Sequence, residues 1–229
     1  DGYIGHLIEF LEKLGPRAHM VAVCQPCVQA LAATAIMAED DNPAAPASLT
    51  LMAGPIDCRL NPTKVNHLAT TRPIDWFEKN LIALVPGRFK GGGRLVYPGF
   101  MQLTAFMSMN LDRHVSAHKE FYQHLIMGDG DSAEKHRDFY DEYYAVLDIS
   151  ADFYLETVAS VFQEFELARG VAMHQGRPVE PRAIRRTALF TVEGERDDIC
   201  SIGQTVAAHD LCPNIRPYLK THHVQTGVG

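Results

Sequence analysis

The chain has 229 residues, of which 46% are hydrophobic, 9% aromatic and 21% charged. This composition is typical of a globular protein and excludes a disordered or fibrous chain, and the length suits one domain with or without a large insertion. Acidic residues outnumber basic ones by 28 to 21, giving a formal net charge of −7, which argues against binding to nucleic acid or anionic lipid. No apolar run reaches the roughly 18 to 20 residues of a membrane span.

Helix and strand patterns alternate over residues 1–59. Apolar residues at helical spacing predict a helix at 1–14, and a short apolar run predicts a strand at 18–23. An Ala-rich helix at 25–39 and a second strand at 49–53 follow. Alternation with short connections is typical of an α/β domain with a parallel sheet.

Residues 60–181 interrupt this alternation of helix and strand patterns. Helical periods predict helices at 76–84, 103–111, 119–125, 133–147 and 153–168, without a strand among them. The alternation then returns, with a strand at 187–193, a helix at 199–209 and a strand at 218–224. We therefore predict an α/β core formed by residues 1–59 and 182–229, which carries a mostly helical cap at 60–181.

Aromatic and methionine side chains are frequent in this insertion. At helical spacing such residues form a core, or they line an apolar groove to which Met supplies adaptable contacts. The sequence leaves both alternatives open for two groups: Tyr97, Phe100, Met101, Phe106, Met107 and Met109, and Phe139, Tyr140, Tyr143 and Tyr144.

The sequence VCQPC at residues 23–27 stands where the first strand gives way to a helix. A thiol at Cys24 would project from a tight turn at the positive end of that helix, which favours a thiolate. The backbone N–H of Gln25 could then donate a hydrogen bond to an oxyanion. The sequence therefore predicts that Cys24 is a nucleophile and Gln25 an oxyanion donor.

The same residues allow other interpretations. The nucleophile elbow of α/β-hydrolases is usually G-x-S-x-G, whereas here Ala22 and Pro26 replace the glycines and Cys24 replaces the serine. Cys24 and Cys27 also match the C-x-x-C pattern of thioredoxin-like redox proteins, although such a domain is about half this size. Half of a zinc site is a further alternative, as is plain packing of two small buried residues.

Asp197 is the candidate acid of a catalytic triad. It lies in the acidic turn GERDD after the strand at 187–193, where a carboxylate could accept a hydrogen bond from an imidazole. Asp198 is the alternative, and a solvated turn without a catalytic role is another. The order of nucleophile, helical insertion and acid agrees with the order seen in α/β-hydrolases.

The triad histidine should follow the last strand, but no histidine lies in 225–229. His222 and His223 fall inside the predicted strand, on opposite faces of the sheet, so at most one of them could approach the site. His114 and His118 form an i, i+4 pair without a third ligand. We therefore expect neither a metal site nor a cofactor.

The cysteine pattern and the chain ends bear on location and completeness. Five irregularly spaced cysteines are unlike a secreted disulfide framework, and no secretory signal is visible, so we expect a reducing, cytoplasmic environment. The chain begins at Asp1 rather than Met and ends in a turn-like stretch at Gly229. We therefore expect it to be a piece of a longer protein.

Several segments together resemble the intracellular polyhydroxyalkanoate depolymerases, which degrade stored poly(3-hydroxybutyrate). These segments extend across nearly the whole chain, so the resemblance does not depend on one motif. They are HMVAVCQPCVQALAA, LTLMAGPIDCRLNPTKVNHLA, LVYPGFMQLTAFMSMN, DFYDEYYAVLDISADFYLETV, FTVEGERDDIC and KTHHVQTGVG.

The resemblance implies an α/β-hydrolase fold of which this chain holds the later strands. It implies a Cys-Asp-His triad in which Cys24 is the nucleophile and Asp197 the acid, with the histidine just beyond Gly229. It also implies an N-terminal part before Asp1 that supplies early strands and a second oxyanion donor. The expected reaction is cleavage of polyester bonds through an acyl-cysteine, and the chain by itself is expected to be inactive.

Two alternatives to a depolymerase remain open. A polyhydroxyalkanoate synthase uses a similar Cys-Asp-His set, although its elbow usually keeps glycines where Ala22 and Pro26 stand. The other alternative is a non-catalytic scaffold on the storage granule. In each case we expect the polymer or the granule surface as partner, and a homo-oligomer is left open.

Overall fold

The structure is a computed structural model that describes residues 1–228. It divides into two compact units, one formed by Asp1–Pro73 with residues 157–228 and the other by Ile74–Glu156. The second unit is thus shorter than the predicted insertion at 60–181, because both ends of that segment pack with the first unit.

The first unit is built on a four-stranded sheet in which all neighbouring strands are parallel. Its order is β1-β2-β8-β9, formed by His19–Val23, Ser48–Met52, Ala188–Gly194 and Lys220–Gln225. The predicted α/β class with a parallel sheet is therefore confirmed. That this sheet forms part of an α/β-hydrolase arrangement stays a prediction.

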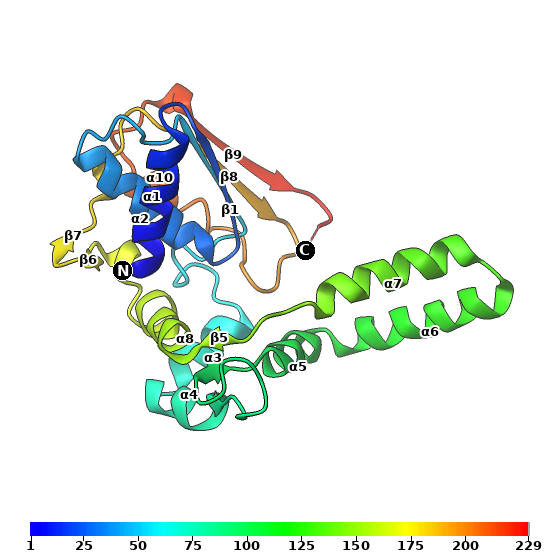
Figure 1. Cartoon of the computed structure of the whole chain (residues 1–229). Helices are drawn as coiled ribbons and strands as arrows, with labels where there is room; N and C mark the ends of the chain where they lie inside the picture. Colours follow the sequence, from blue (N-terminus) through cyan, green and yellow to red (C-terminus); the bar gives the residue numbers. More distant parts are fainter. Residues whose placement is uncertain (229) are drawn as a thin grey trace. The chain divides into compact units, whose positions relative to one another are not determined.

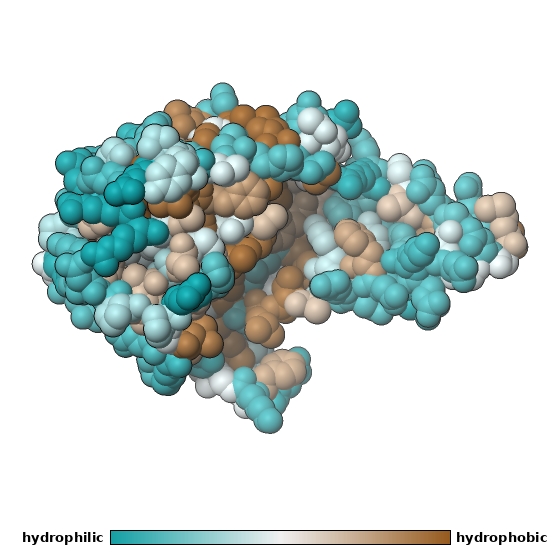
Figure 2. Space-filling view, turned by 90° about the horizontal axis from the view of Figure 1, so that it is seen from above, coloured by the Kyte–Doolittle hydropathy of each residue, from teal (hydrophilic) through white to brown (hydrophobic). Residues whose placement is uncertain are grey.

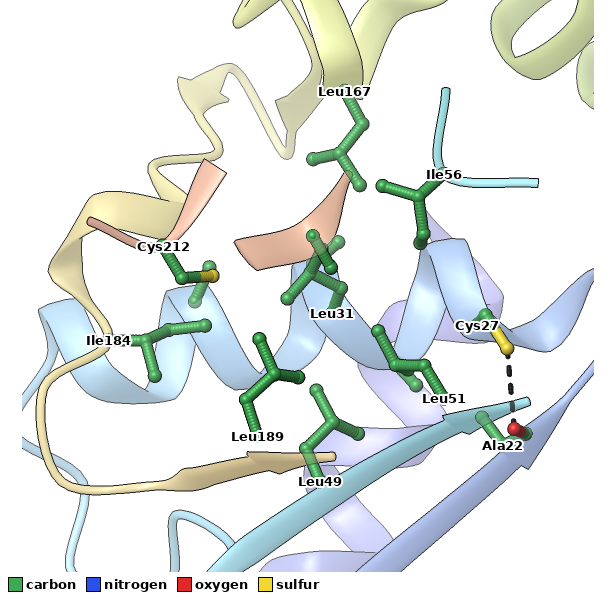
Figure 3. Packing of buried hydrophobic residues seen from close by; sticks show 14 of the residues in the cluster. Ala22, Cys27, Leu31, Leu49, Leu51, Ile56, Leu167, Ile184, Leu189 and Cys212 are labelled. Atoms are coloured by element: carbon green, nitrogen blue, oxygen red, sulfur yellow. Dashed lines mark hydrogen bonds between the residues drawn. The ribbon is translucent and has the colours of Figure 1, made fainter. Parts of the chain in front are cut away.

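One face of this sheet carries the main core. Alternate residues Leu49, Leu51 and Leu189 are buried against α2 (Pro26–Glu39), whose own Leu31 is completely buried (Figure 3). Nine residues of α2 are buried, so this helix is apolar around most of its surface, as expected for a helix enclosed by other elements. The amphipathic α1 (Gly2–Leu14) packs on α2 (Figure 1).

The opposite face of the sheet is much less covered. The side chains of Val21 and Val23 on β1 are 63% and 56% exposed. Because parallel sheets are usually covered on both faces, this half of the sheet is unusually open in the part of the chain that the structure describes.

The remaining elements of the first unit are short. They are α3 (Lys64–Thr71), a π-helix (Val158–Gln163), α9 (Glu166–Arg169), the β6-β7 hairpin (Met173–His174 and Arg177–Pro178), α10 (Ala208–Leu211) and two 3-10 turns (Pro181–Ala183 and Pro217–Leu219).

Two predicted helices are wrong in extent. The predicted helix at 153–168 is divided into α8 (Ala151–Thr157), the π-helix and α9, with a break at Phe165, which has a left-handed backbone (φ 52°). The predicted helix at 199–209 is mostly turns, and only α10 at its end is helical. In that segment the N–H groups of residues 203, 205 and 206 bind the carboxylate of Glu193 rather than helical carbonyls.

The second unit is mostly helical but contains strands that the sequence did not predict. Its helices are α4 (Ile74–Leu81), α5 (Gly99–Met109), α6 (Leu111–Met127) and α7 (Gly130–Tyr144). A small antiparallel sheet joins β3 (Ala83–Leu84), β4 (Leu95–Tyr97) and β5 (Ile149–Ser150). Strands of two or three residues are too short to show a period-2 pattern, which explains why they were missed.

Helices α6 and α7 form an antiparallel hairpin (Figure 1). Its turn contains Gly128 in the left-handed conformation (φ 71°), the usual way for a helix to end. No residue of α6 is buried, whereas Ala133 and Tyr140 of α7 are. Around Tyr140 an aromatic cluster gathers His114, His118, His136, Tyr143 and Tyr144.

Many apolar side chains of the second unit reach its surface. Phe100, Phe139 and Leu147 are exposed, whereas Tyr97 and Tyr140 are buried. An open hollow of about 580 Å³ follows α5 and α6, lined by Met107, Leu111, His114, Val115, His118, Lys119, Tyr122 and Gln123. Figure 2 shows one face of the whole molecule, where hydrophobic residues gather in patches on a mainly hydrophilic surface and are sparse on the hairpin of α6 and α7. The aromatic-rich segments are thus partly core and partly open surface.

Candidate active site

Cys24 lies on a sharp turn between β1 and α2. Its backbone has a left-handed conformation (φ 64°), which is uncommon for a residue other than glycine. Its N–H donates to the carbonyl of Met52 at 2.8 Å, which ties the turn to the end of β2. Such strain is kept where the surroundings determine the backbone, and it is frequent at functional sites. The turn therefore presents the thiol at the carboxyl end of a parallel sheet, where α/β proteins place their ligands.

The residues on either side of Cys24 fit this turn. Ala22 is buried, and Pro26 occupies the first position of α2, where a missing N–H costs nothing. Gly54, in the loop after β2, packs so closely that a Cβ there would overlap the side chain of Cys27 and lie 3.2 Å from the carbonyl oxygen of Cys24. The close backbone approach at this turn is thus made possible by a glycine in a neighbouring loop.

The groups around Cys24 shift the pKa of its thiol in opposite directions. Although the residue is exposed, protein atoms crowd its sulfur, and this loss of solvation raises the pKa of the thiol. The backbone N–H of Gln25 binds the thiolate and lowers the pKa, while the negative charge of Asp197 raises it again. A thiol with these neighbours is protonated at neutral pH and requires a base to become a nucleophile.

Cys27 is completely buried and differs from Cys24 in its chemistry. Its sulfur lies within hydrogen-bonding distance of two carbonyl oxygens, that of Ala22 at 3.3 Å (Figure 3) and that of Met52 at 3.6 Å, which share its single S–H donor. Burial raises its pKa to about 12. All five cysteines are free thiols. A thiol that is buried and already hydrogen-bonded favours a packing role for Cys27 over a role in a redox pair.

Asp197 lies in the turn that follows β8 and is partly buried. Its Oδ1 accepts hydrogen bonds from the N–H groups of Ile199 and Cys200, both at 2.9 Å. Two backbone donors fix the orientation of this carboxylate, and its charge acts on the thiol of Cys24. The alternative acid, Asp198, is exposed. Asp197 and Cys24 therefore lie at the same edge of the sheet, close enough for the charge of the carboxylate to act on the thiol.

The segment after β9 folds against the turn that contains Asp197. The N–H of Glu195 donates to the carbonyl of Gln225 at 3.0 Å, and the N–H of Arg196 donates to that of Val228 at 2.8 Å. The N–H of Gly227 donates to Oε2 of Glu195 at 2.7 Å. The end of the described chain is thus hydrogen-bonded to Arg196, the residue that precedes the candidate acid.

Neither histidine of β9 belongs to this site. Nδ1 of His222 lies 2.9 Å from Oγ1 of Thr191, and its Nε2 lies 3.5 Å from Oε2 of Glu193. His223 faces the other way, with Nε2 3.2 Å from the side-chain oxygen of Gln225. The two rings lie on opposite faces of the sheet, as the strand pattern predicts.

Sequence reasoning missed a buried polar network beside the site. Glu193 is fully buried at the end of β8 and binds the turn at 203–206, and Thr191, on the same face, joins His222 and His209. The sequence did contain a signal: Thr191 and Glu193 stand at the same alternate positions of the strand as Leu189, and these positions face the core. A carboxylate at such a position needs buried hydrogen-bond donors.

No three His, Cys, Asp or Glu side chains in residues 1–228 come together as a set of metal ligands. No helix in that range is both long and apolar enough to cross a membrane.

Comparison with known proteins identifies the family. A family model described as PHB de-polymerase C-terminus matches residues 53–229, more than half of the chain. Asp197 lies inside the matched range, whereas Cys24 and Gln25 precede it. No curated protein matches this sequence. The match and the site at the carboxyl end of the sheet lead to one conclusion: the chain belongs to the PHB de-polymerase family.

Proposed function

We propose that this chain carries the nucleophile and the acid of a cysteine-dependent hydrolase that cleaves the ester bonds of poly(3-hydroxybutyrate). The proposal rests chiefly on Cys24, an exposed residue on a strained turn between a parallel strand and a helix, whose thiol feels the charge of Asp197 at the same edge of the sheet. Family membership supplies the substrate class and the reaction type.

The first half of the proposed reaction forms an acyl-enzyme. A histidine base takes the proton of Cys24, and the thiolate attacks the carbonyl carbon of an ester bond. The oxyanion accepts a hydrogen bond from the N–H of Gln25, at the positive end of α2. The C–O bond then breaks, and the imidazolium gives its proton to the departing alkoxide. A hydroxyl-ended polymer chain leaves, and a 3-hydroxyacyl thioester remains on Cys24.

The second half regenerates the thiol. The histidine takes a proton from water, and the resulting hydroxide attacks the thioester carbonyl. The C–S bond breaks, the sulfur receives the proton back, and a free carboxylic acid is released. In both halves Asp197 accepts a hydrogen bond from the imidazole and stabilises its charged form.

The proposed base is a histidine that follows residue 229 in the longer protein. The hydrogen bond between Arg196 and Val228 supports this, because the next residues of such a chain would begin beside Asp197. We also propose that a second oxyanion donor comes from chain that precedes Asp1. The chain 1–229 is then expected to lack activity when it is tested alone.

The partner and the location follow from the substrate. We propose that the protein acts at the surface of polymer granules in the cytoplasm. The free state of all five cysteines fits a reducing compartment. The second unit, Ile74–Glu156, is proposed to act as a cap.

The test uses the full-length protein and amorphous poly(3-hydroxybutyrate) granules. Release of soluble 3-hydroxybutyrate is followed for the wild type, Cys24→Ala and Cys27→Ala. We expect release from the wild type and from Cys27→Ala, and a loss of at least about 10³-fold for Cys24→Ala, because residual catalysis without a nucleophile is small.

Three results would contradict the proposal. Activity that survives Cys24→Ala would remove Cys24 as the nucleophile. Absence of release from the wild type, with or without a CoA acceptor, would favour a synthase or a scaffold. A matched loss for Cys27→Ala and Cys24→Ala, with both variants folded, would instead support a redox pair.

A further inference from the structure

The loop at 197–206 joins the candidate acid to a buried anchor. Asp197 stands at its start, and at its end three N–H groups converge on the carboxylate of Glu193. Thr205 and Val206 donate to Oε1 at 2.8 and 2.9 Å, and Gly203 donates to both oxygens at 3.1 Å. A carboxylate with no solvent exposure is tolerated because these donors replace water. Glu193 thus holds a non-helical backbone in one conformation.

The side chain of Thr205 connects this loop to the loop after β2. Its Oγ1 accepts a hydrogen bond from the N–H of Gly54 at 2.8 Å and donates one to the carbonyl oxygen of the same residue at 3.0 Å. The hydroxyl is completely buried. One hydroxyl therefore binds both backbone groups of Gly54, and the carbonyl oxygen also accepts a hydrogen bond from the N–H of Ile56 at 2.8 Å. Loss of the hydroxyl would take this acceptor away from the buried N–H of Gly54, which is costly.

Gly54 in turn lies directly on the turn that contains Cys24. A Cβ on Gly54 would overlap the side chain of Cys27, and it would lie 3.2 Å from the carbonyl oxygen of Cys24. Hydrogen bonds thus connect Glu193 to Thr205 and Thr205 to Gly54, and Gly54 packs against the turn of Cys24. Thr205 also belongs to the loop that begins at Asp197.

We propose that Thr205 is a positioning residue, anchored by Glu193, that sets the place of the Asp197 loop relative to the turn of Cys24. The inference rests on the proposed function, because it assumes that these two residues must act together. Reacting groups need their geometry to be held within about 0.5 Å, and a misplacement of about 1 Å costs on the order of 10²-fold in rate.

The test compares three variants of the full-length protein. Thr205→Val removes the hydroxyl but keeps the branched shape, and Thr205→Ser keeps the hydroxyl. Thr187→Val is the matched control, because Thr187 is also buried and donates one hydrogen bond, to the carbonyl of Pro46, next to the opposite end of β8. We expect Thr205→Val to lower kcat on the polymer by about 10- to 100-fold with KM nearly unchanged. Thr205→Ser should stay within about threefold of the wild type, as should Thr187→Val.

A second readout separates this proposal from the proposed function. The rate at which iodoacetamide alkylates Cys24 is followed by mass spectrometry of the peptide that contains it; within residues 1–229 the other four cysteines are buried. Thr205→Val should change the pH profile of this rate, whereas Thr187→Val and Thr205→Ser should not. The change in the alkylation profile is expected even if Cys24→Ala proves active and the depolymerase mechanism fails, because alkylation does not depend on polymer hydrolysis.

Two outcomes would overturn the positioning role. One is an unchanged kcat and an unchanged alkylation profile in a folded Thr205→Val. The other is an equal loss in Thr205→Val and Thr187→Val that follows their loss of stability, which would show a structural effect only.

Discussion

The parallel-sheet unit and the helical unit bury their apolar residues very differently. In the first, α2 and the sheet enclose one continuous cluster of buried side chains. In the second, the 17-residue helix α6 has no buried residue, and its hairpin depends on a few residues of α7 such as Tyr140. Dense packing determines backbone positions, whereas an open apolar surface leaves side chains free to adapt. The proposed chemistry lies in the unit that is densely packed.

The strained turn shows why this difference matters. A left-handed backbone at a residue other than glycine costs on the order of 1–3 kcal/mol and persists only where its surroundings determine it. Cys24 has such a backbone, and β2, Gly54 and Cys27 surround it. A loosely packed unit would relax such a turn.

The difference in packing between the two units is tested most directly by replacing one leucine with alanine in each unit and comparing the loss of stability. Leu51→Ala empties a site with no solvent exposure and should lower the free energy of unfolding by about 2–5 kcal/mol. Leu125→Ala on α6 removes a side chain that is 51% exposed and should change it by less than about 0.5 kcal/mol. Denaturant titration measures both, and equal losses would show that the units are packed alike.

Glycine offers a second, smaller contrast. Gly54→Ala forces a methyl group into Cys27 and should cost about 1–3 kcal/mol through overpacking, with a fall in activity because the turn of Cys24 shifts. Gly130→Ala, at the start of α7, meets no atom within 4 Å and should be nearly neutral. Thermal unfolding and polymer hydrolysis check both. A Gly54→Ala protein of wild-type stability and activity would contradict the close packing.

A partly buried ion pair between Asp57 and Arg59 adds a pH-dependent test of packing within the first unit. Burial raises the pKa of Asp57, but hydrogen bonds from the Arg59 side chain at 2.8 Å and from its backbone more than offset this and leave the pKa below its usual value. A lowered carboxyl pKa gives stability that is present above the unfolded value of about 3.9 and is lost as the pH falls through the folded value.

Arg59→Gln should therefore cost about 1 kcal/mol at neutral pH, a small amount because the guanidinium is half exposed. The gap to the wild type should narrow below pH ~4, as the carboxylate becomes protonated in both proteins. Arg186→Gln, whose partner Asp41 is 3.5 Å away on the surface, is the control and should have no measurable effect. Denaturation at several pH values tests this, and a gap that does not depend on pH would refute the pairing.

The sequence predicted the regular parts of the first unit because local and long-range signals agree there. The apolar run before Cys24 forms β1, and Pro26 begins the helix at the position that suits proline. The strands of the second unit were missed because two or three residues carry no period. Most of the expected helix at 199–209 is replaced by turns, because a distant carboxylate takes its N–H groups.

The candidate site was predictable only in part. Cys24 and Asp197 could be located because each follows a strand of a parallel sheet, and such strands end at the same edge. The roles of Thr205 and Gly54 could not, because their hydrogen bonds join positions 151 residues apart. Spacing along the chain contains no information about such a contact.

The central claim is that Cys24 becomes acylated, and trapping the intermediate tests it most directly. The full-length protein is mixed with a short 3-hydroxybutyrate oligomer, quenched in acid within one turnover, digested and analysed by mass spectrometry. Asp197→Asn is run in parallel as a slowed variant and Cys27→Ala as a control. A 3-hydroxybutyryl thioester on the peptide that contains Cys24, in the wild type and in Cys27→Ala, is the predicted result. Hydrolysis of the oligomer without any adduct on Cys24, or with an adduct on another residue, would contradict the account.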